Sequence, residues 1–291
     1  MQPVLGRLHN FASACILLAC TLATLALACR PAPSPAPPLA GEHPITIGTQ
    51  FPINSTILGQ TRSISVFLPW SYDQHNNPFP VLYLIDGGPE QDFMPVAGLA
   101  ALASLSAQYR EFIVIGVETL DRRFELTTPS QVAYDLEQIP NNGGADDFRR
   151  FIREEVQPLV ESRYRTTGER LVLGESLAGL FIVDTFLRAP ETFDMYIAVS
   201  PSLWWREAKL AKSAARRLQA GFPADKSLYL TSADEPDIRA AIEPLAQALR
   251  AHAPVSLRWW YEPMPEEHHN TIYHPATLRA LRRMLLAREG L

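Results

Sequence analysis

The chain has 291 residues, of which 47% are hydrophobic and 20% charged, and its formal net charge is −5. This composition is ordinary for a globular protein. Because the basic residues are scattered and outnumbered by acids, the composition excludes the nucleic-acid-binding classes. The length fits one large α/β domain with additional segments, or two small domains.

The N-terminal segment predicts a lipoprotein-type signal peptide over residues 1–28. Its start carries Arg7 and no acid, and residues 11–29 contain no charge and are rich in Leu and Ala. Such a run is also long enough to remain as a membrane-spanning helix, which is the alternative. We expect cleavage before Cys29 and lipid attachment to it, because a Pro-rich segment starts directly afterwards; Cys20 is the alternative lipidation site.

The chain after this leader divides into a Pro-rich tether over residues 29–44 and a catalytic domain over residues 45–291. A Pro-rich segment is extended and does not pack into a core. All three cysteines lie at or before Cys29, so the remaining chain cannot form an internal disulfide. We therefore expect an exported protein, periplasmic or in the cell envelope, held to a membrane by its lipid anchor.

The chain beyond residue 45 alternates between strand-like and helix-like segments. Two segments with alternating polarity, 45–50 and 61–68, predict half-exposed antiparallel strands. The later predicted strands are 79–85, 112–117, 171–173, 195–199, 227–231 and 255–261. The predicted helices are 95–107, 145–163, the segment after 173, 206–219, 237–251 and 275–288. This order predicts a mostly parallel central sheet with an antiparallel N-terminal start and helices on both faces. Residues 118–144 form a long loop, a feature that is usually functional or disordered.

The segment Leu171-Val-Leu-Gly-Glu-Ser-Leu-Ala-Gly179 has the pattern of a nucleophile elbow. A buried strand runs into a Gly-x-Ser turn, and a helix follows. This turn lifts Ser176 above the carboxyl edge of a parallel sheet, beside the free N–H groups of a helix start. The alternative is an ordinary strand-to-helix turn with serine as the N-cap.

A serine nucleophile needs a histidine base, and the base needs a partner that fixes its tautomer. The loop after the strand at 227–231 contains three candidate acids: Asp234, Glu235 and Asp237. The loop after the strand at 255–261 contains the candidate bases His268 and His269. For the oxyanion, the expected N–H donors are those of Leu177 and Gly88, with Gly87 as a weaker candidate.

No metal or cofactor is expected. The His-rich loop lacks the helical His-Glu-x-x-His spacing and a second ligand cluster. The chain also lacks a Gly-rich phosphate-binding loop.

Together these segments resemble the esterase D-like branch of the α/β-hydrolases, and within it the bacterial siderophore trilactone esterases. The similarity extends over residues 45–288. The segments that carry it are Pro80–Gly87, Phe148–Pro158, Tyr164–Thr166, Gly174–Phe181, Ser200–Trp205 and His269–Ala276.

The resemblance implies an α/β-hydrolase fold and a serine esterase. It makes Ser176 the nucleophile, His269 rather than His268 the base, and Glu235 the acid, with Asp237 and Asp234 as alternatives. Some members of the branch work with a serine–histidine pair and a weakly placed acid. Two departures stand out: Ala178 occupies the last position of the Gly-x-Ser-x-Gly pattern, and Asn270 follows the histidine in place of a small residue.

Four further residues are candidates for binding the substrate. Trp204 and Trp205 follow a strand end and border the expected pocket. Arg122 and Arg123, in the long loop, suit an anionic or catecholate-like substrate. The expected substrate is a small-molecule ester, either a siderophore lactone or another bulky acyl ester. The alternatives are an acyl-thioester or feruloyl-type esterase and a non-catalytic ligand-binding lipoprotein on the same fold.

Overall fold

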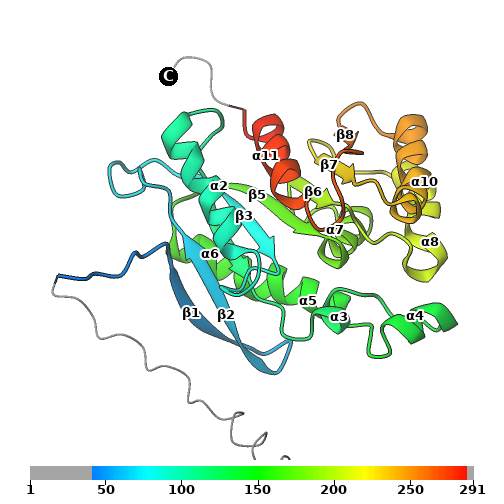
Figure 1. The fold of residues 1–291 in the computed structure, drawn as a ribbon, viewed down its shortest axis with the longest axis horizontal. Coiled ribbons are helices and arrows are strands. Elements are labelled where there is room, and N and C mark those ends of the chain that lie inside the picture. The colour runs from blue at the N-terminus through cyan, green and yellow to red at the C-terminus, as the bar shows by residue number, and fades with distance from the viewer. Residues whose placement is uncertain (1–40, 287–291) are drawn as a thin grey trace, which may run out of the picture. The chain divides into compact units, whose positions relative to one another are not determined.

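A computed structural model describes residues 41–286, and a compact unit begins at Thr46 (Figure 1). Its centre is one eight-stranded sheet with the order β1-β2-β4-β3-β5-β6-β7-β8. The strands are β1 (Thr49–Ser55), β2 (Gln60–Phe67), β3 (Phe79–Ile85), β4 (Ile113–Val117), β5 (Thr166–Glu175), β6 (Met195–Val199), β7 (Ser227–Ser232) and β8 (Arg258–Pro263). The expected signal peptide, both candidate lipidation cysteines and most of the expected tether lie outside the described residues.

The sheet confirms the predicted mixture of strand directions. β1 pairs with β2, and β2 with β4, in antiparallel fashion, whereas all later neighbours are parallel. The prediction of a first strand at 45–50 was wrong, because β1 starts at Thr49 and continues to Ser55. Since the parallel strands share one direction, the loops after β3, β5, β6, β7 and β8 all leave the sheet at one edge.

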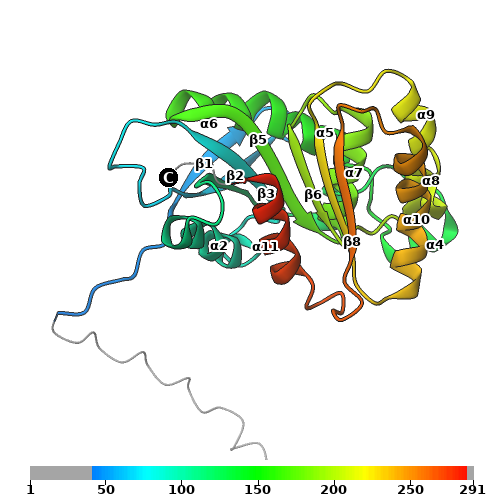
Figure 2. The same cartoon turned by 90° about the horizontal axis from the view of Figure 1, so that it is seen from above.

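Helices cover both faces of the sheet (Figure 2). They are α2 (Phe93–Ser106), α3 (Arg122–Glu125), α4 (Ala133–Gln138), α5 (Ala145–Phe151), α6 (Gln157–Arg163), α7 (Leu177–Arg188), α8 (Trp205–Lys212), α9 (Ala214–Gln219), α10 (Pro236–His252) and α11 (Tyr273–Met284). A π-helical turn, η1 (Ile152–Val156), joins α5 to α6.

Strand β3 shows why the central strands are apolar on both sides. Leu82 and Leu84 pack in one cluster with residues of α2 and α11, whereas Val81, Tyr83 and Ile85 pack in the other with residues of α5 and α7. Successive side chains of a strand point to opposite faces. A strand covered by helices on both faces therefore has no polar positions, and its sequence is continuously hydrophobic.

The predicted helix over 206–219 is divided into α8 and α9. Arg206, Glu207 and Ala208 have φ values of 55°, 54° and 57°, so this turn is left-handed. None of the three is glycine, and each L-residue in this conformation costs roughly 1–2 kcal/mol. The surroundings must therefore hold the turn in place.

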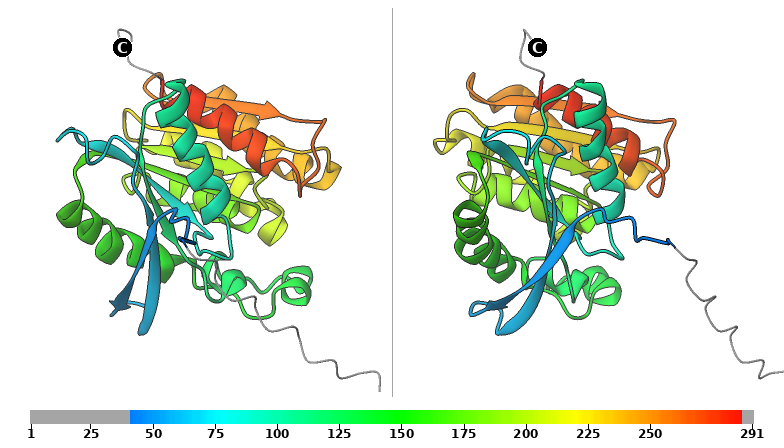
Figure 3. Two further views of the ribbon diagram at one scale, coloured as in Figure 1. Left: turned by 60° about the vertical axis from the view of Figure 1, so that its left-hand side comes forward. Right: turned by 90° about the vertical axis from the view of Figure 1, so that its left-hand side faces the viewer.

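The long loop over 118–144 contains the two short helices α3 and α4, drawn in green in Figure 3. A buried ion pair fastens it to the sheet: Arg62 of β2 binds Glu125 at 2.5 Å and 3.0 Å, and also donates to the carbonyl oxygen of Glu118. The Arg62 side chain is 1% exposed. This anchor holds the loop beside the carboxyl edge of the sheet.

Within residues 41–286, no helix combines the length and apolar composition needed to span a bilayer.

Candidate active site

Ser176 lies at the turn between β5 and α7. Its backbone has φ 60° and ψ −116°, a region that residues other than glycine rarely occupy. The Ser176 N–H donates to the carbonyl oxygen of Val199 at 3.0 Å, and the Ser176 carbonyl accepts from Leu180 and Ser202. The neighbouring strand β6 and the helix α7 therefore hold this strained turn, as expected for a nucleophile elbow.

The alanine at position 178 fits into the elbow because Gly174 has no side chain. Ala178 is fully buried. A Cβ atom placed on Gly174 would lie 2.6 Å from the Cβ of Ala178, well inside van der Waals contact. The additional methyl group thus occupies the space that a side chain at position 174 would need.

His269 lies in the loop after β8, close to the end of β6. Its backbone N–H donates to Glu235 Oε1 at 2.6 Å, and its Nδ1 lies 3.1 Å from Ser200 Oγ. Burial lowers the pKa of His269, Glu235 opposes this shift, and the positive charge of Arg122 adds to it. The histidine is therefore neutral at neutral pH, the form that can accept a proton.

Two serines that the sequence reasoning did not select lie between the expected nucleophile and base. Ser202 Oγ is 3.2 Å from Ser176 Oγ, and Ser200 Oγ contacts the ring of His269. Within residues 41–286, no hydrogen bond joins Ser176 directly to His269. Both serines belong to the segment Ser200-Pro-Ser202, which directly follows a predicted parallel strand. This position in the sequence could have identified them as candidates.

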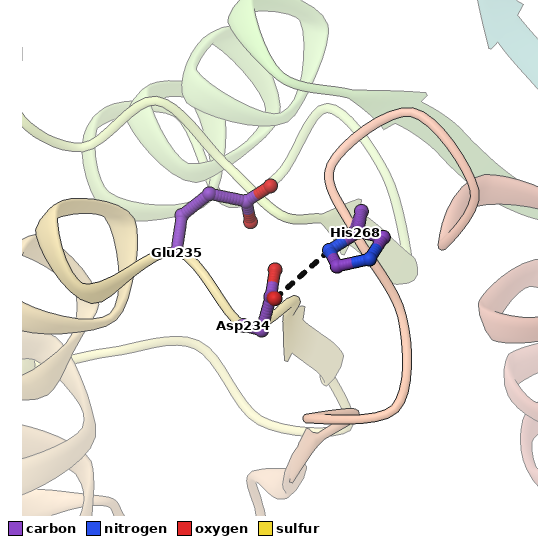
Figure 4. A group of neighbouring side chains, drawn as sticks. All are labelled: Asp234, Glu235 and His268. Carbon is purple, nitrogen blue, oxygen red and sulfur yellow. Dashed lines mark ion pairs between the residues drawn. The ribbon is translucent and has the colours of Figure 1, made fainter.

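The candidate acids have different partners (Figure 4). Asp234 pairs with the exposed His268 at 2.8 Å and raises the pKa of that histidine. Glu235 binds the backbone of His269, and its second oxygen is buried without a hydrogen-bond partner. Asp237 is exposed in the first turn of α10. Of the three, Glu235 is thus the acid that binds the residue expected to act as base.

Asp234, Glu235 and His268 are also the group whose arrangement could hold a cation. Their ligand atoms lie within 4.8 Å of one another. Both acids already bind groups of the loop after β8. Their contacts therefore account for how this loop is held against the start of α10.

The two expected oxyanion donors differ in their present partners. Leu177 is the first residue of α7, so its N–H has no acceptor within the helix. The Gly88 N–H donates to Gln91 Oε1 at 3.0 Å, whereas that of Gly87 donates to the Val117 carbonyl at 2.9 Å. The N–H of Gly87 is therefore used in a backbone hydrogen bond of the sheet. The N–H of Gly88 instead binds a side chain, which can rotate away.

A group of buried carboxyl side chains, not anticipated from sequence, lies beside Ser176. Arg122 Nε binds Asp86 Oδ2 at 2.7 Å, and its Nη2 donates to the carbonyl oxygen of Glu175 at 3.3 Å. Burial, reinforced by the charge of Asp92, raises the pKa of Glu175 to about 8. Burial and the charge of Asp86 raise the pKa of Asp92 to about 6. One arginine thus faces three carboxyl groups, two of which are easily protonated.

The other candidate substrate-binding residues lie in and near the long loop. Arg123 is exposed and donates to the carbonyl oxygen of Gln138 at 3.2 Å. Trp204 is partly exposed and meets the exposed Tyr134 edge-to-face, with ring centroids 5.8 Å apart. Trp205 is buried, and its indole N–H donates to the Thr128 carbonyl at 3.0 Å. Trp205 therefore fastens the long loop, whereas Trp204 and Tyr134 present aromatic surface.

The sheet order, the covering helices and the serine at a strained strand–helix turn define an α/β-hydrolase fold. The structure is similar to that of an IroE-like serine hydrolase from Shewanella oneidensis, with a TM-score of 0.74 and 25% identity over 82% of this chain and 80% of that one. It also resembles the siderophore hydrolase EstB from Aspergillus nidulans, with a TM-score of 0.70 and 20% identity over 89% and 99% of the two chains.

The chain belongs to the family described as "Putative esterase", whose sequence profile matches residues 55–244. It is 30% identical over 149 residues to the ferri-bacillibactin esterase BesA of Bacillus subtilis, covering 46% of this chain and 51% of that protein. It is 32% identical over 140 residues to the siderophore triacetylfusarinine C esterase of Aspergillus fumigatus, covering 44% and 46%. The chain thus spans about half the length of the curated relatives it matches.

Proposed function

We propose that this protein is an exported serine esterase. The observation that carries the proposal is the strained backbone of Ser176 at the β5–α7 turn, with His269 on the loop after β8. In the proposed reaction, Ser176 Oγ attacks the ester carbonyl carbon and His269 takes the hydroxyl proton. The same proton then passes to the departing alcohol, and water hydrolyses the acyl-enzyme with His269 as base.

The negative charge of the tetrahedral intermediate would lie on the carbonyl oxygen, between the N–H groups of Leu177 and Gly88. For Gly88 to donate, the Gln91 side chain has to rotate away or be displaced by the substrate. Glu235 would hold the loop that carries His269 through its backbone, and Ser200 would hold the imidazole ring.

The proposed substrate is a siderophore lactone or another bulky acyl ester. Its support is the similarity to two siderophore esterases, together with the aromatic surface of Trp204 and Tyr134. Arg122 adds a positive charge near the nucleophile, which suits an anionic or catecholate-like substrate. Export with lipid attachment at Cys29 belongs to the same proposal and rests on the leader sequence.

The test replaces the nucleophile. Ser176→Ala should lower the turnover of short p-nitrophenyl esters and of a trilactone siderophore by a factor on the order of 10⁶. Ser162→Ala, an exposed serine in α6, is the matched control and should leave turnover unchanged. Undiminished hydrolysis by Ser176→Ala would overturn the mechanism.

A phosphonate probe separates the esterase from the alternative of a ligand-binding lipoprotein. In the proposed enzyme the probe labels Ser176 covalently, and the Ser176→Ala protein stays unlabelled under the same conditions. If neither protein is labelled and neither hydrolyses any ester in the series, the non-catalytic alternative holds.

A further inference from the structure

A cavity lies apart from the expected catalytic residues. It has a volume of about 410 Å³ and lies between α7, α8, α9 and the long loop. None of Ser176, His269, Glu235 and Gly88 lines it. This volume falls within the range of small-molecule binding sites.

The lining of this cavity is strongly cationic, although the chain as a whole carries a net charge of −5. Its two acids are already neutralised by arginines. Asp146 binds Arg149 at 2.7 Å and Arg188 at 3.0 Å, while Asp184 binds the same two arginines. The remaining cations have no acidic partner within residues 41–286: Arg206, Lys209, Arg216 and Arg217.

One of these cations carries a buried donor that lacks an acceptor. The Nε atom of Arg217 is inaccessible to solvent and has no hydrogen-bond partner. A buried donor without a partner is destabilising, so such groups in native proteins call for an explanation. Arg217 lines the cavity through atoms other than Nε, and a bound anion would pair with the charge of its guanidinium group.

The left-handed turn at Arg206–Ala208 forms part of the same wall. It is held in place because Asp135 Oδ2 accepts the Arg206 N–H at 2.9 Å and Thr128 accepts the Trp205 indole. Strained backbone of this kind is concentrated at ligand clamps and active sites. Here the strain places the Arg206 side chain on the cavity wall.

The other walls are apolar, formed by Leu126, Pro129, Leu180, Trp205 and Leu210. We propose that this cavity is a binding site for a small organic polyanion, a molecule with two or more carboxylate or phosphate groups on an apolar frame. Arg206, Lys209, Arg216 and Arg217 bind its charged groups, and the apolar walls hold its frame. This site is separate from the proposed esterase centre.

The experiment titrates the full protein with citrate and pyrophosphate at low ionic strength, by calorimetry and by the fluorescence of Trp205 and its neighbours. Both probes are small multivalent anions; acetate, with one charge, is the comparison ligand. Binding of citrate alone assigns a polycarboxylate, binding of pyrophosphate alone assigns a phosphate compound, and binding of both assigns the polyanion class. Failure of both to bind overturns the proposal.

The variant Lys209→Glu/Arg216→Glu should weaken binding by about 100-fold, since each of the two lost charge-assisted contacts contributes about tenfold. Both side chains are exposed, so the fold tolerates the change. Lys212→Glu/Arg282→Glu alters the net charge equally outside the cavity and should bind like the wild type. Equal anion affinity in both double variants would overturn the proposal. The Ser176→Ala variant should bind the anions as the wild type does, so the binding measurement is independent of ester hydrolysis.

Discussion

The Nδ1 atom of His269 lies 3.1 Å from the hydroxyl oxygen of Ser200, whereas Glu235 reaches only the backbone N–H of the same histidine. The imidazole is therefore oriented by a hydroxyl group, and the carboxylate holds the loop. A carboxylate stabilises an imidazolium more strongly than a hydroxyl does, because the interaction is between opposite charges. Glu235 therefore lacks the contact with the imidazole ring that the acid of a complete Ser-His-acid triad makes.

Ser200→Ala should therefore lower kcat by about 10- to 100-fold, because the ring loses the group that selects its tautomer and orientation. Glu235→Gln keeps an acceptor oxygen for the His269 N–H and should lower kcat by about threefold or less. Steady-state kinetics on a p-nitrophenyl ester measures both. A severe loss with Glu235→Gln and none with Ser200→Ala would show that the carboxylate takes over the ring during the reaction.

The bounds of a strand could be predicted from the sequence where the strand is buried, because burial gives it a continuous apolar sequence. β3 and β6 have the predicted bounds because each is a buried, continuously apolar run. β1 could not be placed in the same way. It lies at the edge of the sheet and is mostly exposed, so its pattern is weak and the pairing with β2 decides its bounds.

For the candidate site, too, some residues could be predicted from the sequence and others could not. Ser176 and His269 could be selected from motif and position, since each follows a predicted strand. The contact between Ser200 and His269 depends on two loops 69 residues apart in the sequence. The carboxyl groups of Asp86 and Asp92 come from the loop after β3, and that of Glu175 comes from the end of β5. Only the register of β3 beside β5 brings these two segments together, and no local pattern records that register.

The contact between Gln91 and Gly88 leads to a prediction about the oxyanion site. Gln91→Ala removes the side chain that occupies the Gly88 N–H and should change kcat/KM by no more than about threefold. Gln91→Glu places a carboxylate beside the developing oxyanion and should lower kcat/KM by about 10²-fold, comparable to loss of a donor. Equal activity in the two variants would indicate that Gly88 takes no part in the reaction.

Glu175 leads to a prediction about stability and pH. Its pKa in the folded protein is about 8, above the ordinary 4.5, so the folded state binds more protons than the unfolded state between these values. Unfolding then releases protons, and the free energy of unfolding falls as pH rises from about 4.5 through 8. Glu175→Gln should remove this loss and stabilise the protein at pH 9 by on the order of 3 kcal/mol.

Urea unfolding of both proteins at pH 5 and pH 9 measures this difference. The variant should gain stability relative to the wild type only at the higher pH, because the wild-type carboxyl group is protonated at pH 5. An equal gain in the free energy of unfolding at both pH values would mean that the two proteins differ in packing and not in charge.

The contact between Gly174 and Ala178 predicts a rescue. Gly174→Ala places a methyl group 2.6 Å from the Ala178 Cβ and should destabilise the protein by about 2 kcal/mol through overpacking, with loss of activity as the Ser176 turn shifts. Ala178→Gly alone should cost about 1 kcal/mol, the usual cost of glycine in a helix. In the double variant the second methyl group is absent, so the clash is relieved. The free energies of unfolding from urea titrations should then show a favourable coupling of about 1–2 kcal/mol, together with partial recovery of ester hydrolysis. Strict additivity would place the cost at Gly174 in another contact, of which the side chain of Ile182 at 3.3 Å is the nearest.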